Sequence, residues 1–147
     1  MLKERLTQNI KSALLAGDKP RAEVLRGLKA AILNEEVAQR VRDTGLADEQ
    51  IEQVLAREAK KRSESAEMYA RAGQQERADT ELAEKVIIEE FLPKQLTDDE
   101  LAEIVTATLA ELGPNAQMGP IIGAVKGKVG QSADGARIAA AVKLKLG

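Results

Sequence analysis

The chain of 147 residues contains no cysteine, no histidine and no tryptophan. Without cysteine it can form neither disulfides nor thiolate metal sites. Without histidine it lacks the commonest metal ligand and the usual acid–base catalyst near neutral pH. Tyr69 and Phe91 are its only aromatic residues, so a core must be built from leucine, isoleucine, valine and alanine. Such a core suits closely packed helices, and we predict no catalytic residue, no metal and no cofactor.

The sequence also lacks a long apolar run. No stretch approaches the roughly 18 apolar residues that span a bilayer. The first residues, MLKERLTQNIK, lack the apolar segment of a signal peptide. Hydrophobic residues make up 44% of the chain and charged residues 31%, which is typical of a folded protein with solvated helix faces. We therefore expect a cytoplasmic protein with no membrane partner.

Apolar spacing predicts an all-α fold made of two helical bundles. Leucine or isoleucine stands at every fourth position from residue 2 to residue 14, and Gly17 ends this first helix. Asp18 is placed to cap a second helix, which fades around residues 36–42. A third helix begins near Asp48, and Gly73 separates it from a fourth, so these two form a long antiparallel hairpin. The inward residues expected in the fourth helix are Ala78, Leu82, Val86, Ile87 and Phe91.

Pro93 ends the fourth helix, because proline cannot donate a backbone hydrogen bond into a continuing helix. Thr97 and Glu100 then form the pattern of a capping box at the start of a fifth helix. Two shorter helices are expected at about 120–129 and 133–146, with Leu146 on the buried side. The predicted domains are an N-terminal bundle of about four helices, 1–92, and a C-terminal three-helix domain, 97–147.

The C-terminal end combines positive charge with regularly spaced glycines. From Pro114 to Gly147 there are five cations and one acid, a net charge of +4 in a chain whose total is −2. Glycines at 119, 123 and 127 fall on the helix side opposite the apolar residues, with Lys126 at the edge. Glycine inside a helix costs roughly 1 kcal/mol relative to alanine, so these glycines need an explanation. Close packing of a neighbouring helix is the favoured one, because packing is the more frequent use of such glycines. Close approach of an anionic ligand is the alternative.

Other candidate chemistry has simpler explanations. The basic run from Arg57 to Arg62 is interleaved with glutamates, so a solvated face with ion pairs is expected. The serines have no histidine to activate them, and a Lys61–Ser65 pair is geometrically possible but has no distinguishing feature. The acidic clusters are explained by helix capping and solvation.

Three segments together resemble a known family. The first is Arg21…Leu25-Arg26…Ala31-Ile32…Glu35 followed by Glu58-x-Lys60-Lys61-Arg62…Tyr69-x-x-Ala72-Gly73, the second is Glu90-Phe91-Leu92-Pro93-Lys94-Gln95-Leu96-Thr97, and the third is Met118-Gly119…Gly123…Lys126…Gly130…Ala133-Asp134-Gly135…Val142-Lys143…Leu146. They are similar to the YqeY-type proteins and to the tail shared with the B subunit of the tRNA-dependent amidotransferase. Gly127 departs from the pattern, where a bulkier residue is expected.

The resemblance implies a two-part helical fold and a tail that contacts tRNA. In the amidotransferase, the transfer of glutamine nitrogen belongs to a catalytic part that this chain lacks, and similar domains occur joined to a glutaminyl-tRNA synthetase. The leading hypothesis is a non-catalytic tRNA-binding accessory protein, with a synthetase or amidotransferase as a further partner and no DNA. The expected RNA-binding residues are Gly119, Gly123, Lys126, Lys128, Arg137, Lys143 and Lys145.

Two other functions are alternatives to RNA binding. A protein–protein adaptor with no direct RNA contact is the alternative. A carbon–nitrogen ligase that uses glutamine as amido donor is disfavoured, because there is no cysteine nucleophile, no Ser–Lys signature of amidases and no nucleotide-binding loop.

Overall fold

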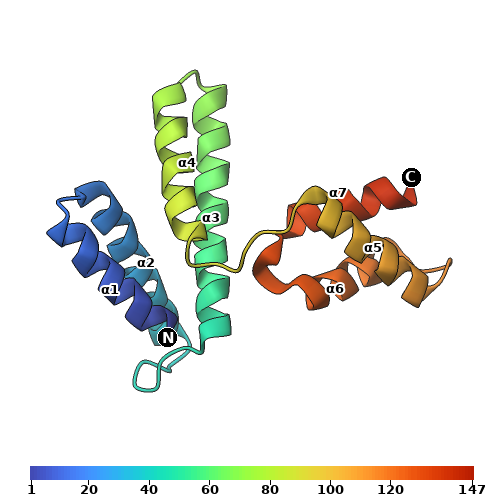
Figure 1. Ribbon diagram of the computed structural model, residues 1–147, viewed down its shortest axis with the longest axis horizontal. Helices are drawn as coiled ribbons and strands as arrows, with labels where there is room; N and C mark the ends of the chain where they lie inside the picture. The colour runs from blue at the N-terminus through green and yellow to red at the C-terminus, as the bar shows by residue number, and fades with distance from the viewer. The chain divides into compact units, whose positions relative to one another are not determined.

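The computed structural model describes residues 1–147 and contains seven α-helices, one short 3-10 turn and no strand (Figure 1). The all-α prediction is confirmed. The chain divides into two compact units, Met1–Leu92 and Pro93–Gly147. The elements are α1 (Leu2–Leu15), α2 (Lys19–Ala38), α3 (Asp48–Arg71), α4 (Gln75–Glu89), α5 (Asp98–Leu112), α6 (Met118–Val129), the turn Gly130–Ser132 and α7 (Gly135–Leu146).

Helices α1 and α2 form a hairpin that turns at Gly17 (Figure 1). Gly17 has a φ of 75°, a left-handed conformation that glycine adopts without the steric cost of a side chain. Asp18 then caps α2, since its Oδ1 accepts a hydrogen bond from the backbone N–H of Arg21 at 3.2 Å. Both features agree with the sequence prediction.

Helices α3 and α4 form the predicted long antiparallel hairpin, which turns at Gly73 with a φ of 76° (Figure 1). Two of the residues expected inside α4 are not buried: Leu82 is 44% exposed and Val86 is 62% exposed. They lie off the line of Ala78 and Ile88, which are the buried residues of this helix. The core of the N-terminal unit is made of Leu6, Val24, Leu25, Leu28, Ile32, Leu46, Ile51, Val54, Leu55, Ala59, Ile88 and Phe91.

One carboxylate, that of Glu36, is fully buried in the N-terminal unit. It accepts hydrogen bonds from Lys3 Nζ at 2.8 and 2.9 Å and from the backbone N–H of Leu46 at 3.0 Å. The Lys3 hydrogen bond holds the pKa of Glu36 below its usual 4.5, although burial acts in the opposite direction. This carboxylate therefore ties the connection between α2 and α3 to the start of α1.

The C-terminal unit packs α5, α6 and α7 around a small aliphatic core that contains Leu101, Val105, Ile121, Val125 and Ile138. Thr97 Oγ1 accepts from the backbone N–H of Glu100 at 3.1 Å, as predicted. The Glu100 carboxylate accepts from the Thr97 hydroxyl at 3.2 Å instead of reaching the backbone N–H, so only half of the capping box forms.

The last helix ends at Leu146 as predicted, but it differs from the prediction in its start and in the exposure of Leu146. It begins at Gly135 and not at residue 133, because residues 130–132 form a 3-10 turn. Leu146, expected on the buried side, is 50% exposed, since it lies in the last turn beyond the buried Ile138 and Val142.

Candidate nucleic-acid interface

The three glycines of α6 form a solvent-exposed strip, which we call the glycine strip: Gly119, Gly123 and Gly127. A methyl group placed on any of them would meet no atom within 4 Å. The expectation that a neighbouring helix packs on these glycines is therefore wrong within the C-terminal unit. The apolar face of α6 buries Ile121 and Val125 on the other side, so the strip exposes bare helix backbone.

Lys126 lies beside the glycine strip and forms no ion pair. Its side chain passes over the first turn of α7, where its Nζ is 3.5 Å from the position that a Cβ would occupy at Gly135. Asp134 caps this turn by accepting from the backbone N–H of Arg137 at 2.8 Å. This distance is that of an ordinary van der Waals contact, so a methyl group at 135 would touch the Lys126 side chain without displacing it, and Lys126 is exposed.

Two of the five predicted cations are already used inside the unit. Lys128 Nζ donates to Thr108 Oγ1 and to Glu111 Oε2, both at 3.0 Å, and so links α6 to α5. Arg137 Nη2 donates to the backbone carbonyl of Leu96 at 2.7 Å and pairs with Asp98 at 2.9 Å. An external anion would have to compete with these partners.

Lys143 and Lys145 occupy the last turn of α7, where both are exposed and neither forms an ion pair. Their charge also favours the helix by interacting with the negative end of its dipole. The unit as a whole is neutral, with six cations and six acids, but the charges are separated. Five of the acids belong to α5 and five of the cations to α6 and α7.

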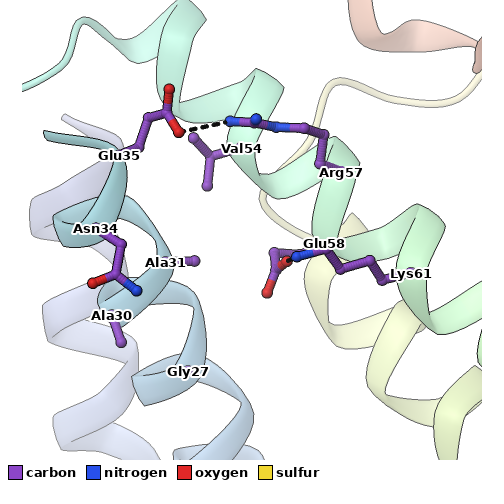
Figure 2. A pocket seen from close by; sticks show the side chains of 9 residues that line it. All are labelled: Gly27, Ala30, Ala31, Asn34, Glu35, Val54, Arg57, Glu58 and Lys61. Carbon is purple, nitrogen blue, oxygen red and sulfur yellow. Dashed lines mark hydrogen bonds and ion pairs between the residues drawn. The ribbon is translucent and has the colours of Figure 1, made fainter. Parts of the chain in front are cut away.

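Three of the four cations in the basic run of α3 form ion pairs, as the sequence predicted, and Lys60 forms none. Arg57 pairs with Glu35 at 3.2 Å, Lys61 with Glu58 at 2.9 Å, and Arg62 with Glu84 at 3.4 Å. The Arg57–Glu35 and Lys61–Glu58 pairs line a cavity of about 420 Å³ between α2 and α3 (Figure 2). The sequence analysis did not predict this cavity. Small residues at 27, 30 and 31, spaced three and four apart on α2, are the only sequence signal for it.

No reactive constellation accompanies these surfaces. No group of three or more acidic side chains is arranged to hold a metal ion. Lys61, the one lysine placed to activate Ser65, donates to Glu58 instead. None of the helices has both the length and the apolar character needed to cross a membrane. The C-terminal unit therefore presents exposed helix backbone at the glycine strip, with the unpaired Lys126 beside it.

Comparison with known proteins places this geometry in a family. A search of curated proteins found no match for the chain. A family model described as Yqey-like protein matches residues 3–146, which is nearly the whole sequence. The chain therefore belongs to the YqeY-like protein family.

Proposed function

We propose that this protein is a cytoplasmic, non-catalytic accessory protein that binds tRNA through its C-terminal unit. The observation that carries the proposal is the exposed glycine strip with the unpaired Lys126 beside it. Helix-interior glycines in open solvent destabilise the helix by roughly 1 kcal/mol each relative to alanine and gain nothing from packing. A polyanion that lies directly against the helix backbone explains their presence.

The two kinds of residue in this surface do different work. Gly119 and Gly123 let a sugar–phosphate backbone approach the helix, while the ammonium group of Lys126 binds a phosphate. Lys143 and Lys145 supply further charge from α7. Lys128 and Arg137 contribute less, because Glu111 and Asp98 already neutralise them. Phosphate contacts of this kind position an RNA without reading its sequence.

A surface with about three phosphate contacts binds weakly alone. Each contact changes the slope of log K against log salt concentration by about 0.7 to 0.9, so the expected slope is roughly −2 to −3. Useful affinity then requires a second protein on the same tRNA, and the resemblance to the amidotransferase tail favours an amidotransferase or an aminoacyl-tRNA synthetase. The amidation of a mischarged tRNA would take place on that partner.

The proposal is tested by measuring tRNA binding across salt concentrations for the wild type and the Lys126→Glu, Lys143→Glu double variant. We expect weaker binding by the variant and a salt slope shallower by about 2. The matched control is Lys11→Glu, Lys29→Glu, which makes the same change in net charge at two exposed lysines of the N-terminal unit that form no ion pair. Equal affinities and slopes for wild type and test variant would refute the proposal.

A specific observation favours the adaptor as the second candidate. Leu82 and Val86, one turn apart on α4, are exposed although their spacing is that of a buried face. A partner protein that covers them should survive ribonuclease treatment in a pull-down from lysate and be lost with Leu82→Glu, Val86→Glu. A partner that ribonuclease removes would instead support the RNA-binding function.

A further inference from the structure

The N-terminal unit contains a half-open groove between α2 and α3, which we call the α2–α3 groove. Its volume is about 420 Å³, within the range of small-molecule sites. Figure 2 shows Ala31 on α2 facing Glu58 on α3 across the groove, with Val54 near the Glu35–Arg57 pair that bridges the two helices.

The α2 wall is built from the smallest side chains. Gly27, Ala30 and Ala31 lie within about one turn of α2, and a methyl group at Gly27 would meet no atom within 4 Å. Alanine in place of Gly27 would stabilise an exposed helix by roughly 1 kcal/mol. Gly27 thus keeps open a space that the rest of the unit does not fill. The wall is apolar and can receive an aliphatic side chain.

The charged groups of the groove come as two opposite pairs. Glu35 and Arg57 form an ion pair of 3.2 Å between α2 and α3, and Glu58 and Lys61 form one of 2.9 Å on α3. The hydrogen bonds from Gln39 and Arg57 lower the pKa of Glu35, which keeps its carboxylate ionised. Arg57 is 60% exposed, and a pair as exposed as this one is weak and opens easily.

Asn34 adds a further polar group, because its side-chain amide makes no hydrogen bond within the protein. It lies one residue before Glu35 on the same helix.

We propose that the α2–α3 groove binds a free amino acid with an aliphatic side chain. The ligand inserts into the Glu35–Arg57 pair: its carboxylate accepts from Arg57 and Asn34, and its ammonium group donates to Glu35. Its side chain lies against Ala31 and Val54. No covalent step is involved, and the site is distinct from the proposed RNA-binding surface.

Charge balance selects the zwitterion over singly charged ligands. The groove has two acids and two bases, so a zwitterion that separates Glu35 from Arg57 leaves every charge with a partner. An anion would occupy Arg57 and leave Glu35 unpaired, while a cation would leave Arg57 unpaired. Glu35 is the less exposed partner at 27%, so leaving its carboxylate unpaired is unfavourable, and a polyanion such as nucleic acid is not the ligand expected here.

The experiment is an NMR titration of the full-length, ¹⁵N-labelled protein with L-leucine in phosphate buffer. We expect saturable shifts confined to the backbone amides of Gly27, Ala30, Ala31 and Asn34 and of the facing turns of α3. Two derivatives that each lack one charge serve as ligand controls: L-leucinamide and N-acetyl-L-leucine should bind at least tenfold more weakly. Absence of saturable shifts at these amides, or equal binding of either derivative, overturns the proposal.

Ala31→Leu fills the groove with a side chain of the variant itself. We expect loss of leucine binding with no fall in melting temperature, since leucine is a good helix former. Ala70→Leu, on an exposed turn of α3 outside the groove, is the matched control and should bind as the wild type does. If Ala31→Leu is misfolded, Arg57→Gln removes the carboxylate partner without adding bulk and should weaken binding tenfold or more. Undiminished leucine binding by a folded variant of either kind overturns the assigned site.

Discussion

Replacing glycines of the strip with alanine is expected to stabilise α6 and to weaken tRNA binding. In Gly123→Ala, Gly127→Ala both new methyl groups point into open space, and neither glycine has a positive φ. Each substitution should stabilise α6 by roughly 1 kcal/mol, so the pair should add about 2 kcal/mol. Since each 1.4 kcal/mol is a factor of ten, exchange of the α6 amide protons by local unfolding should slow by about 30-fold.

The same variant should bind tRNA less tightly, because two methyl groups now stand between the helix backbone and the ligand. A loss of about 1 kcal/mol, or roughly fivefold in Kd, is expected. Fluorescence anisotropy with labelled tRNA at a fixed salt concentration measures it. Gly27→Ala is the matched control, since it also fills an open position on an exposed helix and should gain stability without changing tRNA affinity.

Either of two results would refute the reasoning. Unchanged tRNA affinity in a stabilised variant would show that nothing lies against the glycine strip. A less stable variant would show that the methyl groups collide with a part of the protein, against the open space found around both positions.

Three further predictions concern the N-terminal unit. Glu36→Ala should lower the free energy of unfolding by about 2–3 kcal/mol in a urea titration, because the Leu46 N–H is left unpaired and Lys3 loses its partner. The folded pKa of Glu36 lies below 4.5, so ionised Glu36 stabilises the folded state at pH 7. The difference in unfolding free energy between wild type and Glu36→Gln should be complete at pH 7 and disappear as the pH falls through that folded pKa. A difference that does not change with pH would contradict the lowered pKa of Glu36. Gly45→Ala should cost about 1–2 kcal/mol from its φ of 79° alone, and more than Gly17→Ala, because only its Cβ would lie 3.2 Å from the Glu36 carboxylate.

Local signals were predictable from the sequence because each depends on a few neighbouring residues. Asp18 and Thr97 cap helices whose N–H groups lie within three positions, and Gly17 and Gly73 end helices by adopting a positive φ. The apolar face of α6 likewise follows from its own periodicity. Helix order and the turns between helices therefore needed no knowledge of the tertiary structure.

The features that matter most for the candidate site involve partners that are distant in the sequence. Glu36 is buried only because Lys3, 33 positions away, neutralises it. Lys128 and Arg137 belong to the same basic segment as Lys126, but acids of α5 pair with them, while Lys126 forms no ion pair. Which cations of a basic segment stay available to a ligand is thus decided by tertiary contacts.

The central segment Glu90–Thr97 is one of the three segments that carry the family resemblance. Its residues make contacts that stabilise the fold of each unit. Glu90 pairs with Arg21 at 2.7 Å, and the guanidinium of Arg5 lies 4.8 Å from the centre of the buried Phe91 ring, so these residues secure the end of the N-terminal unit. Gln95 donates to the carbonyl of Gln131 at 2.9 Å inside the C-terminal unit. Substitutions here should change stability first.

The glycine strip differs from this central segment, because alanine at its positions would stabilise α6 and would lose no contact inside the protein. Gly17 and Gly73 are needed for turns, but Gly119, Gly123 and Gly127 have no positive φ and empty surroundings. Gly119 lies in the first turn of α6, so the interior cost applies to Gly123 and Gly127, about 2 kcal/mol together in a unit whose core is small. A loss of that size without a compensating contact inside the protein is best explained by a contact outside it. For this reason the proposed RNA contact is placed on α6 and not on the paired cations of the unit.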